Sequence, residues 1–81
     1  MSPMQHTVVA ELVANVLSVN VAPGDTVTPA DEVAVLESMK MEIPVLAEVA
    51  GTVGEIVVAA GDVVHEGDPL VIIESVRGAA A

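Results

Sequence analysis

The chain has 81 residues and a formal net charge of −10, and it contains no cysteine, phenylalanine, tyrosine or tryptophan. This length corresponds to a single domain. The missing residue types exclude disulfides, thiolate metal sites, cysteine nucleophiles and aromatic platforms for base stacking. The acidic balance opposes binding to nucleic acid and to anionic membranes, so we expect neither as a partner.

The N-terminal residues and the hydropathy of the chain predict a cytoplasmic protein. The N-terminus lacks the positively charged region and the following apolar block of a secretory signal. No apolar stretch approaches the length that a bilayer-spanning helix needs.

The residue pattern along the chain predicts short strands throughout. Valine is the most common residue, and this β-branched enrichment favours strands over helices. Pro, Gly and Asp recur at intervals of about ten residues and mark the turns, so no window is long enough for a helix. The predicted strands are residues 7–12, 14–19, 26–27, 32–38, 41–47, 51–58, 63–64 and 70–74. We expect a domain at residues 7–76, an N-terminal tail at 1–6 and a disordered C-terminal tail at 77–81.

The two halves of the chain repeat each other without a gap when the sequence is shifted by 37 positions. Gly24 then falls on Gly61, Val27 falls on Val64, and residues 35–38 fall on residues 72–75. Solenoids need at least three copies for stability. Two copies, each with four predicted strands, therefore indicate one all-β domain, a flattened eight-stranded barrel or sandwich with pseudo-twofold symmetry.

The only lysine, Lys40, lies almost at the midpoint of the chain, between the predicted strands 32–38 and 41–47. A chain with one lysine offers no competing target to an enzyme that modifies a single side-chain amine. The short link between the strands predicts a two-residue hairpin whose central residues, Met39 and Lys40, need φ > 0, where Asn-Gly or Asp-Gly is favoured. Met39 and Lys40 are unfavourable at these positions and reduce the folding stability by about 1–3 kcal/mol per strained residue. A turn that keeps such residues indicates a site retained for function. The alternative is a longer, relaxed loop with ordinary surface residues.

The repeat also predicts where this hairpin lies. Met39 and Lys40 align with Val76 and Arg77, where the second copy ends. Pseudo-twofold symmetry therefore places the hairpin and the chain termini at opposite ends of the body.

Other polar side chains are predicted to have structural roles. His6 and His65 are expected to be plain surface residues, since neither has a second ligand at zinc spacing. We therefore predict no metal site and no catalytic residue. Four aspartates are expected to cap turns that contain Gly or Pro. These residues are Asp25, Asp31, Asp62 and Asp68.

The segment Glu37-Ser38-Met39-Lys40-Met41-Glu42 resembles the attachment motif of biotin carboxyl carrier domains, whose usual core is Ala/Ser-Met-Lys-Met. The resemblance extends over residues 7–75 and includes the turns at 24–25, 50–53, 61–64 and 67–70. It implies a barrel-sandwich hybrid of two four-stranded antiparallel sheets, with the lysine on an exposed hairpin. Ser38 stands where Ala is commoner. No insertion precedes the motif, so we expect a thumbless member of the family.

The resemblance implies covalent biotin on Lys40, attached by a separate biotin protein ligase. Met39 and Met41 would form an apolar surface on both sides of Lys40 that the ligase and the carboxylase recognise. Glu37 and Glu42 would be solvated charges that also help to dock a basic ligase surface. The chain would be a non-catalytic biotin carboxyl carrier protein, a monomer in isolation. It would carry carboxybiotin between the biotin carboxylase and carboxyltransferase subunits of a biotin-dependent carboxylase.

Two other functions stay open on the sequence. A lipoyl carrier of a 2-oxo acid dehydrogenase complex would share the fold and the lysine position. Lipoyl domains commonly have Asp-Lys-Ala or similar at that position, whereas Met39 and Met41 favour biotin. An unmodified β-sandwich acting as an interaction module is the third possibility, although such modules are expected in longer chains with flanking helices.

Overall fold

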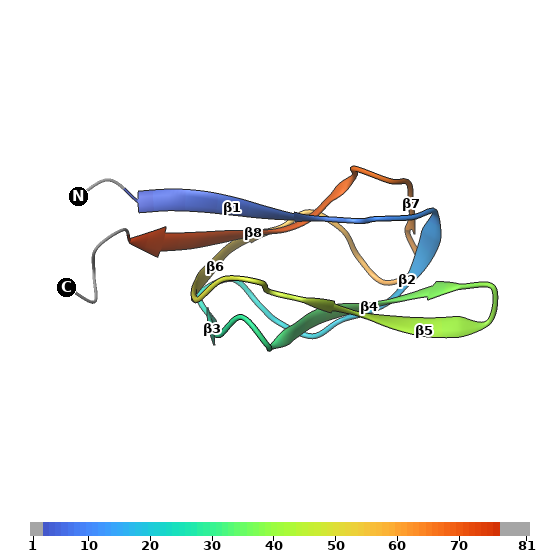
Figure 1. Cartoon of the computed structure of the whole chain (residues 1–81), viewed down its shortest axis with the longest axis horizontal. Coiled ribbons are helices and arrows are strands. Elements are labelled where there is room, and N and C mark those ends of the chain that lie inside the picture. The colour runs from blue at the N-terminus through green and yellow to red at the C-terminus, as the bar shows by residue number, and fades with distance from the viewer. Residues whose placement is uncertain (1–2, 77–81) are drawn as a thin grey trace.

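The computed structural model describes residues 3–76, and this part of the chain forms eight strands without a helix (Figure 1). The strands are β1 (Pro3–Val9), β2 (Ala14–Val19), β3 (Thr26–Val27), β4 (Glu32–Ser38), β5 (Met41–Leu46), β6 (Gly51–Ile56), β7 (Val63–Val64) and β8 (Pro69–Val76). Within these residues there is accordingly no helix able to span a membrane. The prediction of an all-β, eight-stranded domain is confirmed.

The strands form two four-stranded antiparallel sheets, in the orders β1-β8-β6-β3 and β5-β4-β2-β7. Strands β1 to β4 come from the first copy of the repeat and β5 to β8 from the second, so each sheet contains two strands from each copy. Exchanging each strand for its counterpart in the other copy converts one order into the other. The structure therefore has the predicted pseudo-twofold symmetry, and the two copies interdigitate.

The core is a layer of aliphatic side chains between the two sheets, and strand alternation selects them. In β2, for example, Ala14 and Val16 are buried whereas Asn15 and Leu17 are exposed. The largest fully buried side chains are Leu36, Leu70, Ile73, Val8, Val16, Val33, Val53 and Val71. No buried side chain among the described residues is polar or charged. Hydrophobic burial of small β-branched residues therefore provides the main stabilisation of a domain that has no aromatic residue.

The four aspartates cap turns as predicted. In each case Oδ2 accepts a hydrogen bond from the backbone N–H three residues earlier, at 2.8 to 2.9 Å. The donor and acceptor pairs are Ala22 with Asp25, Thr28 with Asp31, Ala59 with Asp62, and His65 with Asp68. The caps occupy equivalent turns in the two copies, so the repeat preserves the turn chemistry as well as the strands.

Some strand bounds differ from those expected. Strand β1 begins at Pro3 and ends at Val9, whereas residues 7–12 were expected, and β8 extends beyond the predicted 70–74. Each strand is longer than expected because the two pair with each other from Pro3 opposite Val76 to Val9 opposite Pro69, with a register shift between Val8 and Val9. Long-range pairing of this kind leaves little trace in local sequence. The predicted N-terminal tail, residues 1–6, overlaps the start of β1, and the predicted tail at 77–81 lies outside the described residues.

Two further strands end earlier than predicted. Strand β5 ends at Leu46 rather than at residue 47, and β6 ends at Ile56 rather than at residue 58. Beyond these ends, Ala47 N–H donates to Asp31 O and Val57 N–H donates to Leu70 O. These two amides therefore have backbone partners even though their residues lie outside the strands.

Substitution of the turn glycines should destabilise the fold more than substitution at the hairpin serine. Gly24 and Gly61 have φ values of 96° and 97°, and no atom lies within 4 Å of a Cβ at either position. The penalty for Gly24→Val or Gly61→Val is therefore conformational and should be on the order of 1–3 kcal/mol. Ser38→Ala should cost less. Thermal unfolding checks this, and equal midpoints for the three variants would contradict it.

Two glycines of β6 provide a matched test of how closely β6 and β8 approach. A Cβ on Gly51 would collide with the backbone carbonyl oxygen of Glu74, whereas a Cβ on Gly54 would meet only the flexible side chain of Glu74. Gly51→Ala should therefore lower the free energy of unfolding by roughly 1–3 kcal/mol. Gly54→Ala should have a clearly smaller effect in the same chemical denaturation experiment. A similar decrease in the free energy of unfolding for both variants would show that the Glu74 carbonyl does not limit how closely β6 and β8 approach.

Candidate functional site

Lys40 lies in a two-residue hairpin that joins β4 to β5. Ser38 is opposite Met41 in the antiparallel ladder, so Met39 and Lys40 alone make the turn. Their φ values are 55° and 66°, and positive φ at both central residues is the requirement of a type I′ turn. The predicted tight hairpin is confirmed, and the alternative of a relaxed loop is wrong.

The hairpin forms one end of an elongated body that measures 43 by 18 by 18 Å. The first residue of β1 and the last residue of β8 lie at the opposite end (Figure 1). The placement predicted from the repeat is therefore confirmed. A group attached at the hairpin would stand clear of the described chain ends.

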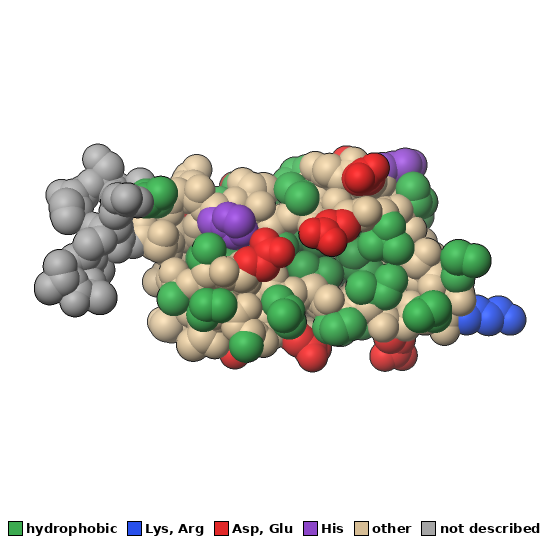
Figure 2. All heavy atoms as spheres, viewed as in Figure 1, with side chains coloured by type: hydrophobic (Ala, Val, Ile, Leu, Met, Phe, Trp, Pro, Cys, Tyr) green, Lys and Arg blue, Asp and Glu red, His purple; other side chains and the backbone are tan. Residues whose placement is uncertain are grey.

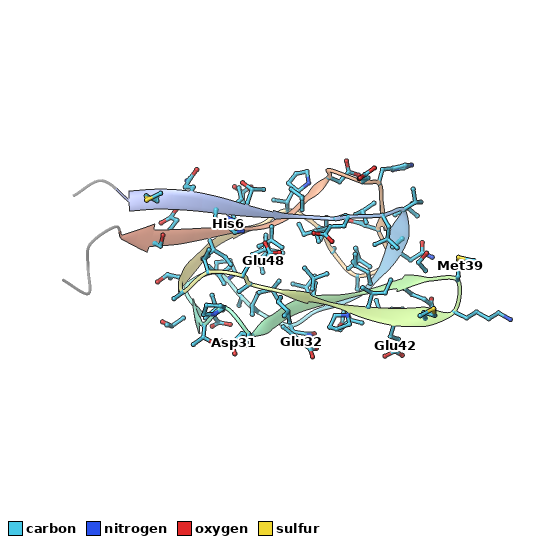
Figure 3. The ribbon with its side chains drawn as sticks, viewed as in Figure 1. His6, Asp31, Glu32, Met39, Glu42 and Glu48 are labelled. Carbon is cyan, nitrogen blue, oxygen red and sulfur yellow. The ribbon has the colours of Figure 1, made fainter. Side chains whose placement is uncertain are left out.

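The hairpin residues project into solvent instead of packing into the core. The side chains of Met39 and Met41 are 91% and 65% exposed, and Lys40 is also exposed. Figure 2 shows a basic side chain projecting from this end of the molecule, and Figure 3 places Met39 beside the turn. Lys40 forms no hydrogen bond or ion pair with another described residue. The structure thus brings the three predicted site residues together, with a free amine between two exposed thioethers.

The two faces of the hairpin differ in chemistry. Glu37 lies directly opposite Glu42, and Ser38 lies directly opposite Met41 on the other face. Like charges at directly opposite positions repel each other. Since no basic residue pairs with either glutamate within residues 3–76, this acidic pair is available to a positively charged partner.

A hollow lies at the base of the hairpin, and sequence reasoning missed it. Its lining includes Val13, Asn15 and Val63 together with the hairpin residues Glu37 to Lys40. Asn15 is the ladder partner of both Glu37 and Val63, so β2 brings β7 beside the hairpin. Val13 and Val63 are more than half exposed. A protein that approaches Lys40 would therefore also meet these two valines, whose proximity depends on strand order and not on any local motif.

His6 makes a contact that the sequence did not predict. Its Nε2 lies 3.0 Å from Oε1 of Glu48, which is 42 residues away in the chain (Figure 3). His6 lies at the surface, as expected, and in addition pairs with Glu48 there. His65 is exposed, with Nδ1 3.8 Å from an oxygen of Asp68 in its own turn. No group of three or more His, Cys, Asp or Glu residues within the described chain is arranged to hold a metal ion.

Comparison with solved structures shows close similarity to parts of two carboxylases. One is a single-chain, multi-domain long-chain acyl-CoA carboxylase, with a TM-score of 0.84, 29% identity and coverage of 99% of this chain and 8% of that one. The other is the urea carboxylase of Kluyveromyces lactis, with a TM-score of 0.81, 31% identity and coverage of 86% and 6% of the two chains. The fold described above therefore occurs as a small part of much larger carboxylase chains.

Sequence relatives are small proteins. The biotinylated protein TB7.3 of Mycobacterium tuberculosis is 56% identical over 41 residues, which are 51% of this chain and 58% of that protein. The biotin/lipoyl attachment protein of Bacillus subtilis is 50% identical over 38 residues, or 47% and 52% of the two chains. The matched region thus spans somewhat more than half the length of these curated relatives.

The family match covers most of the chain. Residues 1–73 match the biotin/lipoyl family model, which is described as that of a biotin-requiring enzyme. This description and the biotinylated relatives support covalent biotin as the cofactor, in agreement with the expectation from the sequence. The all-β fold and its two four-stranded sheets agree with the same assignment. The chain therefore belongs to the biotin/lipoyl attachment family.

Proposed function

We propose that this chain is a biotin carboxyl carrier protein, in which Lys40 receives biotin and moves a carboxyl group between two enzymes. Those enzymes would be the biotin carboxylase and the carboxyltransferase of a multi-subunit biotin-dependent carboxylase. One observation carries the proposal. The only lysine of a chain that belongs to this family stands at the exposed apex of a two-residue hairpin.

The amine of Lys40 is an acceptor and requires activation by another protein. Only a neutral amine, which has a free lone pair, attacks a carbonyl carbon. No described residue forms a hydrogen bond or an ion pair with the Lys40 side chain, so none is placed to act as the base. A biotin protein ligase would supply the base and biotinyl-AMP. The amide bond would then form between Nζ and the biotin carboxyl carbon as AMP leaves and the nitrogen loses a proton.

The body of the domain would hold the base of the modified side chain on a rigid element. Strands β4 and β5 pair up to Ser38 and Met41, so only the turn and the lysine side chain extend beyond the ladder. Bound biotin supplies the ureido nitrogen that accepts and releases the carboxyl group. Tethering raises the effective concentration of that group at both enzymes without new contacts. The chain would therefore transport the group and catalyse neither reaction.

The residues beside Lys40 provide the chemistry for recognition. Met39 and Met41 present adaptable apolar surface to the ligase and the carboxylase. The opposed pair Glu37 and Glu42 would attract a basic surface on those partners. Exposed charges act over about 8–10 Å at ordinary ionic strength, so the acidic pair should affect the association rate and its salt dependence.

A lipoyl carrier is the second candidate. One relative is named as a biotin/lipoyl attachment protein, and an exposed hairpin lysine would accept either acyl group by the same amide chemistry. The methionines on both sides of Lys40 favour biotin, as the sequence analysis indicated. An unmodified interaction module gains no support from the isolated, solvent-facing amine.

The modification can be tested by co-expressing the chain with a biotin protein ligase and, separately, with a lipoate ligase. We expect intact-mass analysis to show one biotinyl group, no lipoyl group, and no modification after Lys40→Arg. The arginine variant keeps the charge but offers no acylable amine. A protein that gains no biotin, or that keeps it in the arginine variant, would contradict the proposal. Complete lipoylation without biotinylation would favour the second candidate.

Met39 is expected to lower the stability of the turn while it contributes to recognition by the ligase. Asn is favoured where a type I′ turn requires positive φ, so Met39→Asn should raise the free energy of unfolding by roughly 0.5–1 kcal/mol. Met41 lies in β5 without positive φ, so Met41→Asn is a matched control that should not stabilise the protein. Both variants should be biotinylated more slowly, as measured by ligase kinetics. Faster biotinylation of the stabilised Met39→Asn protein would show that the ligase does not recognise the Met39 side chain.

A further inference from the structure

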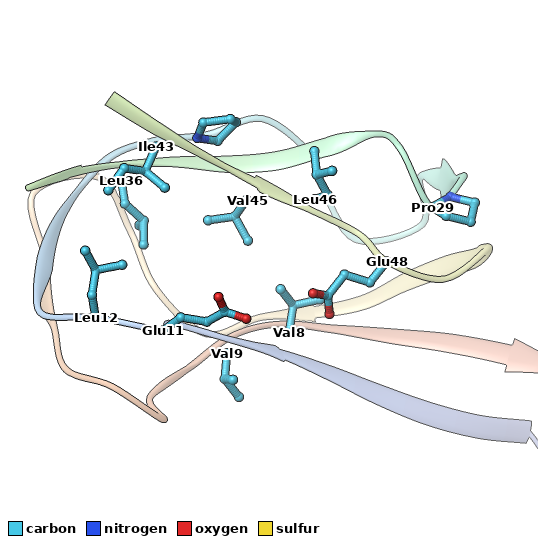
Figure 4. Close-up of a pocket in the computed structure, with 11 residues that line it drawn as sticks. Val8, Val9, Glu11, Leu12, Pro29, Leu36, Ile43, Val45, Leu46 and Glu48 are labelled. Carbon is cyan, nitrogen blue, oxygen red and sulfur yellow. The ribbon is translucent and has the colours of Figure 1, made fainter. Parts of the chain in front are cut away.

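A groove runs along one flank of the molecule between strands β1 and β5 (Figure 4). These strands are the outermost strands of the two sheets, so the groove lies where the edges of the sheets face each other. Its apolar lining includes Val8, Leu12, Leu36, Ile43 and Val45. Edge strands beside apolar surface are common sites for the docking of extended segments.

Two carboxylates enter this groove from opposite walls. Glu11 follows β1 and Glu48 follows β5, and both side chains point into the space between the strands (Figure 4). The repeat relates the two residues, since Glu11 aligns with Glu48 as Val8 aligns with Val45. The groove therefore lies across the pseudo-twofold axis, with one acid from each copy.

The two acids differ in their partners. Glu48 accepts a hydrogen bond from, or pairs with, His6 Nε2 at 3.0 Å. Ile43 occupies the position equivalent to His6 in the second copy. Glu11 consequently has no such partner and makes no hydrogen bond or ion pair within residues 3–76. At least one carboxylate in the groove, that of Glu11, therefore has no partner among the described residues.

The backbone at Glu48 is held in a conformation that favours glycine. Its φ is 73°, and residues other than glycine adopt this region at a cost of about 1–3 kcal/mol. Hydrogen bonds from Glu48 N–H to Pro29 O and from Ala47 N–H to Asp31 O fix the segment at 3.0 and 2.8 Å. These bonds fix the backbone from which the Glu48 side chain extends into the groove.

We propose that this groove docks an extended segment of a partner protein that carries apolar side chains and a Lys or Arg placed between Glu11 and Glu48. The apolar lining suits the aliphatic side chains, and the two acids suit a cation between them. A second copy of this chain is a poor occupant, because each copy has a net charge of −10 and a single lysine. Basic, apolar segments of another protein fit both features.

The groove and the hairpin occupy different parts of the surface. The groove lies on the flank, whereas Lys40 is at the end of the long axis (Figures 1 and 4). A segment held in the groove would leave the lysine free. The proposal does not depend on which acyl group Lys40 carries.

The test uses two synthetic peptides with blocked ends, one alternating valine with lysine and one alternating valine with glutamate. Each is titrated to millimolar concentration into the 15N-labelled full chain, monitored by amide chemical shifts. We expect the lysine peptide to shift Val8, Leu12 and Val45 in a saturable manner and the glutamate peptide to have no such effect. E11Q/E48Q should weaken binding of the lysine peptide about tenfold.

A control with the same change in charge separates the groove from the net charge. E55Q/E66Q also removes two charges, but from exposed residues outside the groove lining, and it should bind like the unsubstituted protein. If the double variant is unstable, E11Q alone is used, because the Glu11 side chain makes no hydrogen bond or ion pair within residues 3–76 that the substitution would remove. Biotin transfer to Lys40 should be equal in all variants, so this test and that of the carrier function can fail separately.

Several results would overturn the proposal. These are an absence of shifts at millimolar lysine peptide, shifts located away from the groove, equal binding of the glutamate peptide, and equal weakening by E55Q/E66Q. Dimerisation of the free chain in sedimentation, lost in E11Q/E48Q, would assign the groove to a second copy and also overturn it.

Discussion

The burial of aliphatic side chains between two interdigitated sheets is the constraint on which this molecule depends. Each sheet takes two strands from each copy of the repeat, so neither copy can cover its apolar face without the other. The domain has no aromatic residue and no disulfide, and the packing of Val, Leu and Ile must therefore compensate for the loss of conformational entropy. This interlocking supplies a rigid body beneath the hairpin that presents Lys40.

The hairpin gains its function from that rigid body. Strands β4 and β5 pair from the core to the last residues before the turn, so the strain of two positive φ values is concentrated at Met39 and Lys40. Elsewhere in the described chain, positive φ falls on the turn glycines Gly24, Gly61 and Gly67 and on one further residue, Glu48. Aspartates cap four of the turns. A carrier requires one amine that partner enzymes can reach from solvent, and the exposed apex meets that requirement.

The pseudo-symmetry is broken at residues of the two surfaces that are proposed to meet other proteins. The turn at Lys40 has no described counterpart, and His6 has an apolar counterpart, Ile43, so only one of the two groove acids is paired. The conserved features of the two copies are the core and the capped turns. The differences include the residues of the hairpin and the His6 position beside the groove, and these two surfaces are the ones proposed to meet other proteins. The repeated residues therefore form the scaffold, and single residues that differ between the copies distinguish its two ends and flanks.

The sequence by itself determined the strands of the repeat, the turn aspartates and the hairpin at Lys40, because each depends on local chemistry or on strict alternation. It also placed the hairpin opposite the chain ends, since that follows from symmetry alone. Only the tertiary structure decided the exchange of strands between the sheets, the contact of His6 with Glu48, and the positions of Val13 and Val63 beside the hairpin. These features join residues far apart in the chain, and no local pattern encodes which distant strand completes a sheet.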